Sequence, residues 1–313
     1  MTTLILTHPA CVEHDPGKGH PEAPARLKAV LGGLERWEAA GTAASGAIAW
    51  VEAPKAERDV LLLVHGAEHV DRVLGAVPKS GTAYLDPDTG LSPATGDAAM
   101  RAVGAVTAGV DAVLGGTAQN AFAAVRPPGH HATPNRAMGF CLFNNIAIGA
   151  LHARKNHGLG RIAVLDFDVH HGNGTEAVFR DDDGLFFASS HQFPYYPGTG
   201  SGRQDSAHIL NAPLAPGSGS AEFRAAWEQK LLPALEQFAP ELVLISAGFD
   251  AHRRDPLADI NLVEADFAWA TGEIRAIAES CCAGRLVSTL EGGYDLDALA
   301  ASAVAHVEAL ARQ

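Results

Sequence analysis

Short apolar runs alternate with helical patterns along this 313-residue chain, and this alternation most constrains the possible fold. Six runs have the composition of strands: residues 3–7, 120–125, 162–165, 185–189, 242–247 and 286–290. Repeated strand–helix units form a parallel sheet with helices on both faces. No repeat or linker interrupts the alternation, so we predict a single α/β catalytic domain over residues 1–313.

The segments between these runs divide into helical patterns and long loops. Helices are predicted at residues 24–39, 60–77, 92–115, 142–158, 221–238, 263–280 and 296–310. Ser92 is the expected N-cap of the third helix. Segments 8–23, 78–92 and 191–208 are rich in Gly, Pro and polar residues, so we expect them to be loops that shape the rim of a site.

Polar residues of metal-ligand type directly follow the fully apolar run at 162–165. Asp166, Asp168, His170 and Asn173 lie within eight residues of one another. Side chains two positions apart on an extended chain point the same way, so Asp168 and His170 would meet at one point. A single acidic residue after a strand is commonly a helix N-cap. Four ligand-type residues behind one buried strand instead favour a site for a divalent transition metal.

Three other predicted strands also end in polar motifs. His130 and His131 follow one strand, Asp250 follows another, and Tyr294 follows the last one after two glycines. Because ligands of parallel α/β sheets bind at the carboxyl ends of the strands, we expect these motifs to share one site.

Asp168, His170 and Asp250 together offer one nitrogen and two carboxylate ligands. Three protein ligands with an open fourth position are the catalytic pattern for zinc rather than the structural one. A zinc ion there would acidify a water and polarise a substrate carbonyl. This donor set therefore predicts a mononuclear zinc hydrolase that acts on an amide or an ester.

The remaining polar residues supply the other parts of such a reaction. A histidine of the His130–His131 pair would serve as general base and acid. Asp166 and Asn173 are suited to orient the two imidazoles and to select their tautomers. Tyr294 would donate to a tetrahedral oxyanion.

Composition excludes several classes of partner. Lys and Arg total 23 against 36 Asp and Glu, a net charge of -13, which argues against nucleic acid or an anionic membrane. The first 15 residues lack the features of a signal peptide, and no apolar run reaches membrane-spanning length. The cysteines show no CxxC spacing, so we expect reduced thiols in a cytoplasmic protein. They are Cys11, Cys141, Cys281 and Cys282.

Five ordered motifs resemble those of the zinc-dependent histone deacetylase superfamily. They are RPPGHHA (126–132), GFCLFNN (139–145), DFDVHHGNGT (166–175), SAGFDAHRRDPLA (246–258) and LEGGYD (290–295). With the early HPEAPARL, the resemblance covers nearly the whole chain. Asn173 and SAGFDA are similar to the class II and bacterial amidohydrolase branch.

The resemblance implies the arginase/deacetylase α/β fold, with a mainly parallel sheet of about eight strands. It implies zinc on Asp168, His170 and Asp250. It also implies His131 as general base and acid paired with Asn173, His130 paired with Asp166, and Tyr294 at the oxyanion. A structural potassium ion is expected on backbone oxygens of Asp166, Asp168 and His170 with Ser189 and Ser190.

The resemblance further implies the parts that grip the substrate. The Gly139 carbonyl would accept the substrate N–H, and Phe140 and Tyr196 would line a narrow tunnel. Leu257 stands where the polyamine-specific eukaryotic relative carries a glutamate, which favours acetyl-lysine-like substrates. Either Asp86 or Asp88 would hold the substrate backbone at the rim.

The leading hypothesis is thus an amidohydrolase that removes an acetyl group from Nε-acetyl-lysine in a protein, a peptide or a small molecule. An acetylpolyamine amidohydrolase is the first alternative. Arginase-like chemistry with two manganese ions needs more carboxylates than DFDVHHGNG supplies. A non-catalytic acetyl-lysine reader would have no reason to keep the full catalytic set. The natural substrate, the acyl length and the oligomeric state stay open.

Overall fold

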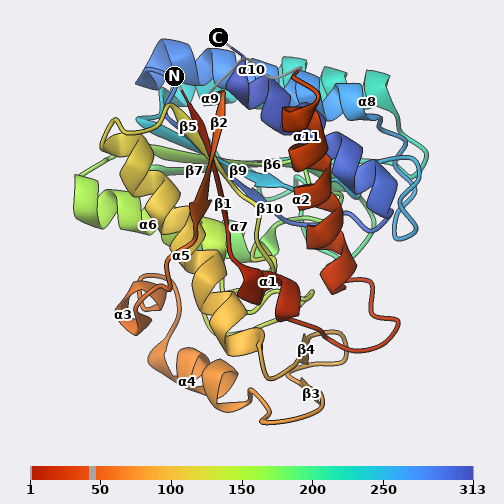
Figure 1. The fold of residues 1–313 in the computed structure, drawn as a ribbon. Helices are drawn as coiled ribbons and strands as arrows, with labels where there is room; N and C mark the ends of the chain where they lie inside the picture. The colour runs from red at the N-terminus through yellow and green to blue at the C-terminus, as the bar shows by residue number, and fades with distance from the viewer. Residues whose placement is uncertain (1, 42–46, 313) are drawn as a thin grey trace.

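An eight-stranded sheet lies at the centre of the computed structural model, which describes residues 2–41 and 47–312 (Figure 1). Its strand order is β2-β1-β5-β10-β9-β6-β7-β8, and all neighbouring strands are parallel. The strands are β1 (Thr3–Thr7), β2 (Ile48–Glu52), β5 (Asn120–Ala123), β6 (Ile162–Asp166), β7 (Leu185–Gln192), β8 (Ile209–Leu214), β9 (Leu242–Ala247) and β10 (Leu286–Leu290). The prediction of a parallel sheet of about eight strands is confirmed.

The central strands are mostly apolar and are buried along their whole length because helices cover both faces of the sheet. Every residue of β5, β6, β9 and β10 is buried. Such continuous apolar runs, without the alternation of a half-exposed strand, are typical of parallel sheets. These four strands form the middle of the sheet, where the main hydrophobic core surrounds them.

The two edge strands, β2 and β8, were not predicted from the sequence. In β2 only Ile48 is buried, while Trp50 and Val51 are exposed. In β8 the apolar pattern is interrupted by Asn211 and Pro213. Proline is tolerated at the edge of a sheet, where its missing N–H breaks no ladder. Edge strands therefore lack the apolar run that identifies the central ones. A separate hairpin pairs β3 (Ala83–Tyr84) with β4 (Gly90–Leu91).

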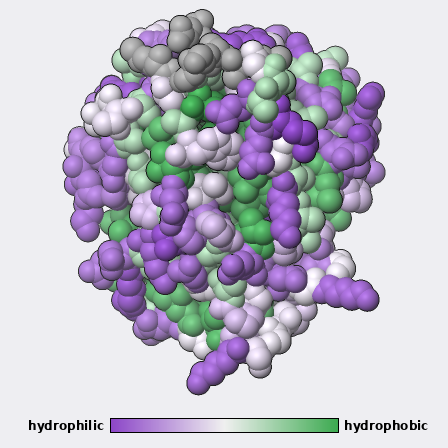
Figure 2. Space-filling model, in the orientation of Figure 1, coloured by the Kyte–Doolittle hydropathy of each residue, from purple (hydrophilic) through white to green (hydrophobic). Residues whose placement is uncertain are grey.

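Helices cover the sheet on both sides (Figure 1). One layer contains α5 (Thr95–Leu114), α6 (Asn145–His157) and α7 (Asn173–Phe179), with α1 (Pro9–Glu13) packed on α5. The other contains α2 (Pro24–Ala39), α10 (Glu264–Cys282), α11 (Leu296–Ala311) and the run α8 (Ser220–Ala226), η1 (Trp227–Leu231) and α9 (Leu232–Phe238). Among the described residues, no helix is long and apolar enough to cross a membrane. Hydrophilic side chains cover much of the face seen in Figure 2, with apolar ones between them.

Two helix predictions were wrong in detail. The pattern at 60–77 is divided into α3 (Arg58–Leu61) and α4 (Ala67–Gly75). The intervening turn is held by a tertiary hydrogen bond. The Gly66 N–H donates to the Pro134 carbonyl at 3.1 Å instead of to a carbonyl of a continuous helix. Ser92 is not an N-cap: α5 begins at Thr95, whose hydroxyl accepts from the Ser92 N–H at 2.7 Å.

A buried ion-pair cluster ties the N-terminal segment to two loops at the carboxyl edge of the sheet. Glu22 is fully buried and contacts Arg126, Arg26 and His14. Arg126 begins the loop that carries His130 and His131. Arg26 donates to the Gly293 carbonyl at 2.6 Å and therefore grips the loop after β10. Glu22 thus pairs with both of the guanidinium groups that hold these loops.

We expect Glu22→Gln to lower the free energy of unfolding by about 3 kcal/mol, because it leaves two buried arginines without their carboxylate. Burial alone would raise the pKa of Glu22, but the two arginines outweigh it and hold the pKa well below its ordinary value of 4.5. The folded protein therefore binds fewer protons at Glu22 than the unfolded chain does. This stabilisation is complete above pH 4.5 and is lost as the pH falls. Urea unfolding of both proteins between neutral and acid pH measures the effect, and equal stabilities at pH 7 would contradict it.

Candidate active site

Four adjacent strands, β5, β10, β9 and β6, bring the predicted site residues to one edge of the sheet. His130 and His131 follow β5, Tyr294 follows β10, Asp250 follows β9, and Asp168 follows β6. Neighbouring strands of a sheet lie about 4.8 Å apart, so loops from four consecutive strands meet within one pocket. The convergence predicted from the strand ends is therefore observed, and the strand order explains it.

Asp168, His170 and Asp250 form a tight cluster at this edge of the sheet, and His170 lines the pocket. Their ligand atoms all lie within 4.8 Å of one another. His170 Nδ1 is 3.1 Å from Asp168 Oδ1 and 3.1 Å from Asp250 Oδ2. We had expected Asp168 and His170 on an extended strand. Strand β6 ends at Asp166, however, so both residues lie in the bend that follows it. Their side chains still converge.

Backbone groups fix the direction of both carboxylates. The Val169 N–H donates to Asp250 Oδ1 at 2.8 Å, and the Gly292 N–H donates to Asp168 Oδ2 at 2.8 Å. A Cβ at Gly292 would overlap Asp250 Oδ2, and one at Gly248 would overlap Asp168 Oδ2. The glycines are therefore required because backbone packs directly on the carboxylates. Two carboxylates and one imidazole in this spacing fit a divalent transition metal such as zinc.

The two histidines after β5 each hydrogen-bond a different partner. His130 Nδ1 lies 2.9 Å from Asp166 Oδ2, and His131 Nδ1 lies 2.8 Å from Asn173 Oδ1. The two imidazole rings pack together with centroids 4.0 Å apart. Because Asn173 Oδ1 can only accept, it holds the proton of a neutral His131 on Nδ1 and leaves Nε2 free.

The partners also separate the protonation behaviour of the two imidazoles. Burial lowers the pKa of His130, but the carboxylates of Asp166 and Asp168 outweigh it and raise the pKa to about 10. Burial and the neighbouring His130 and His170 hold the pKa of His131 well below its ordinary value. One histidine therefore favours the charged form and the other the neutral form.

Tyr294 lies beside the metal-ligand cluster on the loop after β10. The Arg26 guanidinium lies 4.8 Å from the centroid of its ring, and its backbone N–H donates to Asp255 Oδ2 at 2.7 Å. Burial holds the pKa of Tyr294 well above its ordinary value although Arg26 lowers it. The hydroxyl therefore stays protonated and can donate a hydrogen bond.

A cavity of about 100 Å³ opens above these groups. Its lining contains the substrate-gripping residues that the resemblance implied; it consists of Asp88, Pro128, His130, His131, Gly139, Phe140, His170, Tyr196, Leu257, Gly292 and Tyr294. Gly139 and Phe140 have φ values of 57° and 68°, so the chain turns sharply there. A Cβ at Gly139 would overlap the His131 ring, which shows how closely this backbone approaches the imidazole.

Aromatic rings and one rim carboxylate form the walls. The Phe140 and Tyr294 rings pack edge to face at 6.0 Å, and the Tyr196 and His131 rings do so at 5.2 Å. Asp88 lines the cavity, whereas Asp86 does not and instead accepts from the Asp88 N–H at 3.2 Å. Geometry thus brings Asp88, and not Asp86, to the pocket.

The residues expected around potassium lie at the end of β6, in the bend that follows it and on β7. Asp166 is paired with Ser189 in the sheet, and both Ser189 and Ser190 are buried. The Ser190 hydroxyl accepts from Trp227 Nε1 at 3.0 Å, and the Ser189 hydroxyl pairs with His191 Nδ1 at 2.9 Å. Asp166, Ser189 and Ser190 are thus neighbours in the sheet, and the potassium ion stays a prediction.

Sequence reasoning missed three groups that hold the site together. Glu291 Oε2 accepts from the Gly129 and His130 N–H groups at 2.7 and 3.2 Å, and burial raises its pKa to about 7. Asp255 orients the backbone of Tyr294, and Arg26 covers its ring. Glu291 directly follows a predicted strand and adjoins the GlyGlyTyr motif. Its position could therefore have indicated a site residue. Arg26 belongs to the early HPEAPARL motif, but its contact with Tyr294 joins segments that are remote in sequence.

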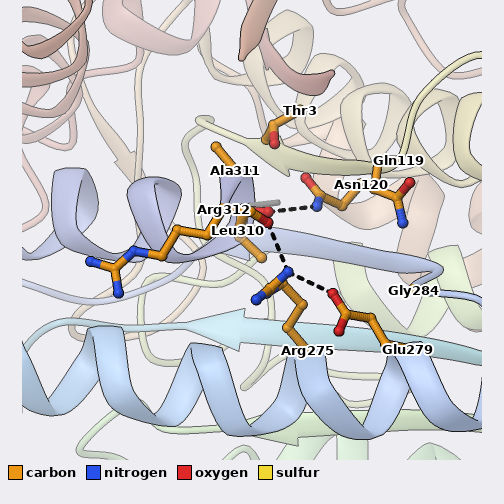
Figure 3. Close-up of a pocket in the computed structure, with 9 residues that line it drawn as sticks. All are labelled: Thr3, Gln119, Asn120, Arg275, Glu279, Gly284, Leu310, Ala311 and Arg312. Carbon is orange, nitrogen blue, oxygen red and sulfur yellow. Dashed lines mark hydrogen bonds and ion pairs between the residues drawn. The ribbon is translucent and has the colours of Figure 1, made fainter. Parts of the chain in front are cut away.

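A larger cavity of about 340 Å³ lies at the opposite edge of the sheet, near the beginning of β1 and β5. Figure 3 shows that Asn120, Arg275 and Glu279 in its lining engage their own neighbours. Arg275 donates to Glu279 and to the Arg312 carbonyl, and Asn120 donates to the Leu310 carbonyl. It lacks the ligand cluster and the histidines, so we assign the chemistry to the smaller pocket.

The chain belongs to the histone deacetylase family. Residues 20–310 match the family model described as "Histone deacetylase domain". The fold, the order of the motifs and the pocket geometry agree with this membership, and the predicted resemblance is confirmed.

Individual relatives extend the comparison. The chain is 39% identical over 300 residues to the histone deacetylase-like amidohydrolase of Pseudomonas aeruginosa, covering 93% of this chain and 77% of that protein. It is 37% identical to the chloroplastic histone deacetylase 10 of rice, covering 96% of this chain and 71% of the relative. The crystal structure of the HDA15 HD domain superposes with a TM-score of 0.91 at 32% identity, covering 99% of this chain and 88% of that one.

Proposed function

We propose that this protein is a zinc-dependent amidohydrolase that removes the acetyl group from Nε-acetyl-lysine in a protein, a peptide or a small molecule. The observation that supports it most directly is the meeting of three groups in one pocket. These are the Asp168–His170–Asp250 cluster, the His131–Asn173 pair and Tyr294. Hydrolysis of an amide needs an electrophilic centre, a base and an oxyanion donor, and this pocket offers all three.

Zinc would be held by Asp168 and Asp250 through oxygen and by His170 through Nδ1. The two carboxylates would neutralise the ion in a site that is almost fully buried. When bound, zinc supplies a Lewis acid that polarises the acyl carbonyl and lowers the pKa of a water.

The protein groups carry the proton transfers. His131 accepts a proton from the attacking water at Nε2, and it later gives that proton to the leaving lysine amine. Asn173 keeps the other His131 nitrogen protonated and fixes the plane of the ring. The Tyr294 hydroxyl donates to the oxygen of the tetrahedral intermediate, where negative charge develops. His130, paired with Asp166, supports the charge distribution beside the base.

The narrow cavity suits a straight alkyl chain that ends in an acylated nitrogen. The Phe140 and Tyr196 rings would contact its methylenes, and the Gly139 carbonyl would accept the amide N–H. Asp88 would accept hydrogen bonds from substrate backbone at the rim. Leu257 adds apolar surface where a carboxylate would favour a second cationic amine, which supports acetyl-lysine over acetylpolyamines. A structural potassium ion on the backbone near Asp166, Ser189 and Ser190 is part of the same proposal.

We expect the zinc-loaded protein to hydrolyse a fluorogenic acetyl-lysine peptide. A chelator should abolish the activity, and added zinc should restore it, because the electrophile is then removed and returned. Turnover of the peptide should exceed that of acetylputrescine and acetylspermidine under the same conditions. A strong preference for the polyamines would overturn the substrate class but keep the chemistry. No turnover of either class, with zinc bound, would overturn the proposed activity.

A further inference from the structure

A second group of metal-ligand side chains lies outside the pocket, between helices α5 and α6. Asp111 on α5 faces His152 and His157 on α6, and their ligand atoms all lie within 4.8 Å of one another. Among the described residues, this group and the pocket cluster are the two sets of His, Cys, Asp or Glu that meet this distance.

The three side chains converge on a single oxygen. His152 Nε2 and His157 Nε2 each lie 2.7 Å from Asp111 Oδ1. The histidines are five positions apart in the sequence, and the carboxylate from the neighbouring helix bridges their rings, whose centroids are 6.2 Å apart. In the described part of the chain, both ion-pair partners of Asp111 are these histidines. No lysine or arginine competes for this carboxylate there.

One of the three side chains is nearly buried, and the other two are open to solvent. The His152 side chain is 9% exposed, whereas His157 and Asp111 are 27% and 53% exposed. The Asn156 carboxamide lies 3.0 Å from His152 Nδ1. Turned end for end, it would accept the Nδ1–H of an imidazole that binds metal through Nε2. An ion could therefore enter from solvent, and water could complete its coordination.

We propose that Asp111, His152 and His157 form a second binding site for a divalent transition metal such as Zn²⁺. Two imidazoles and one carboxylate are ligands that zinc, nickel and copper accept, whereas calcium and magnesium prefer oxygen alone. A bound ion would replace the shared hydrogen bonds and join the C-terminal half of α5 to the end of α6. Its effect is therefore stabilisation of the layer that these two helices form. The inference does not rest on the proposed hydrolase activity.

The test is the zinc content of the full chain after equilibrium dialysis at micromolar free zinc, compared between wild type and His157→Ala. We expect His157→Ala to bind one equivalent of zinc less than the wild type. This difference does not depend on how much zinc the active-site pocket binds. Zinc should also raise the Tm of the wild type above that of His157→Ala. The added rise should be about 2 °C at a free zinc concentration roughly ten times the Kd.

Two further variants keep the test specific. Asp111→Asn should reproduce the loss, and His208→Ala, which removes a histidine outside the group, should retain the second equivalent. His157 lies at the exposed end of α6, so its replacement should leave the fold intact. Equal zinc content in wild type and His157→Ala would overturn the site and leave only a hydrogen-bonded cluster. An equal loss in His208→Ala would overturn it as well.

Discussion

His131→Ala should lower kcat/KM for an acetyl-lysine peptide by about 10³-fold, within the range for a general acid–base group. Two features of the structure lead to this expectation. Asn173 Oδ1, 2.8 Å from His131 Nδ1, leaves Nε2 free to take a proton. Burial and the neighbouring imidazoles favour the neutral ring. The same ring would act first as base and then as acid, so its loss affects both halves of the reaction. Steady-state kinetics with the fluorogenic peptide measures the change.

Three controls separate this role from a structural one. Zinc content should match that of the wild type, because His131 is not among the proposed ligands. Asn173→Ala removes only the partner and should cost about 10- to 100-fold. His208→Ala, outside the pocket, should have no effect. If His131→Ala retained most of the activity with zinc bound, another group would have to be the base. If zinc were lost, the assignment of ligands would be wrong instead.

The sequence predicts which strands are buried, but not which strands lie side by side. Predominantly apolar runs predicted β5, β6, β9 and β10, because strands covered on both faces bury nearly all of their side chains. The polar residues behind them could then be assigned to one edge. The order of the strands was not predictable, because an apolar run shows burial but not which strand lies beside it. The edge strands β2 and β8 were missed because edge positions accept polar residues and proline.

The same limit applies inside the pocket. Asp168, His170 and Asp250 were predicted from residue type and spacing, and the structure brings them together. The left-handed backbone at Phe140 was not predicted, because a bulky residue rarely takes that conformation and only the surrounding loop imposes it. Arg26 lies 268 positions before Tyr294, yet it covers that ring. Contacts between distant segments depend on the complete packing and leave no local pattern.

Tyr294→Phe should lower kcat by about 10²- to 10³-fold and change KM little, as loss of one oxyanion donor does. The hydroxyl would act mainly where negative charge develops, so its removal weakens the transition state more than the bound substrate. The ring itself should stay in place, because the Arg26 guanidinium and the Phe140 ring contact its faces and edges rather than the hydroxyl. The substitution therefore removes one hydrogen-bond donor and little else.

Tyr84→Phe is the matched control, because it makes the same chemical change at a side chain that is 58% exposed. It should leave kcat and KM unchanged. Zinc content and Tm of Tyr294→Phe should equal those of the wild type, which would locate its effect in the reaction and not in the fold. A rise in KM with kcat unchanged would mean that Tyr294 only binds substrate. An unaffected kcat would mean that the oxyanion is stabilised by other groups, and the role proposed for this hydroxyl would be wrong.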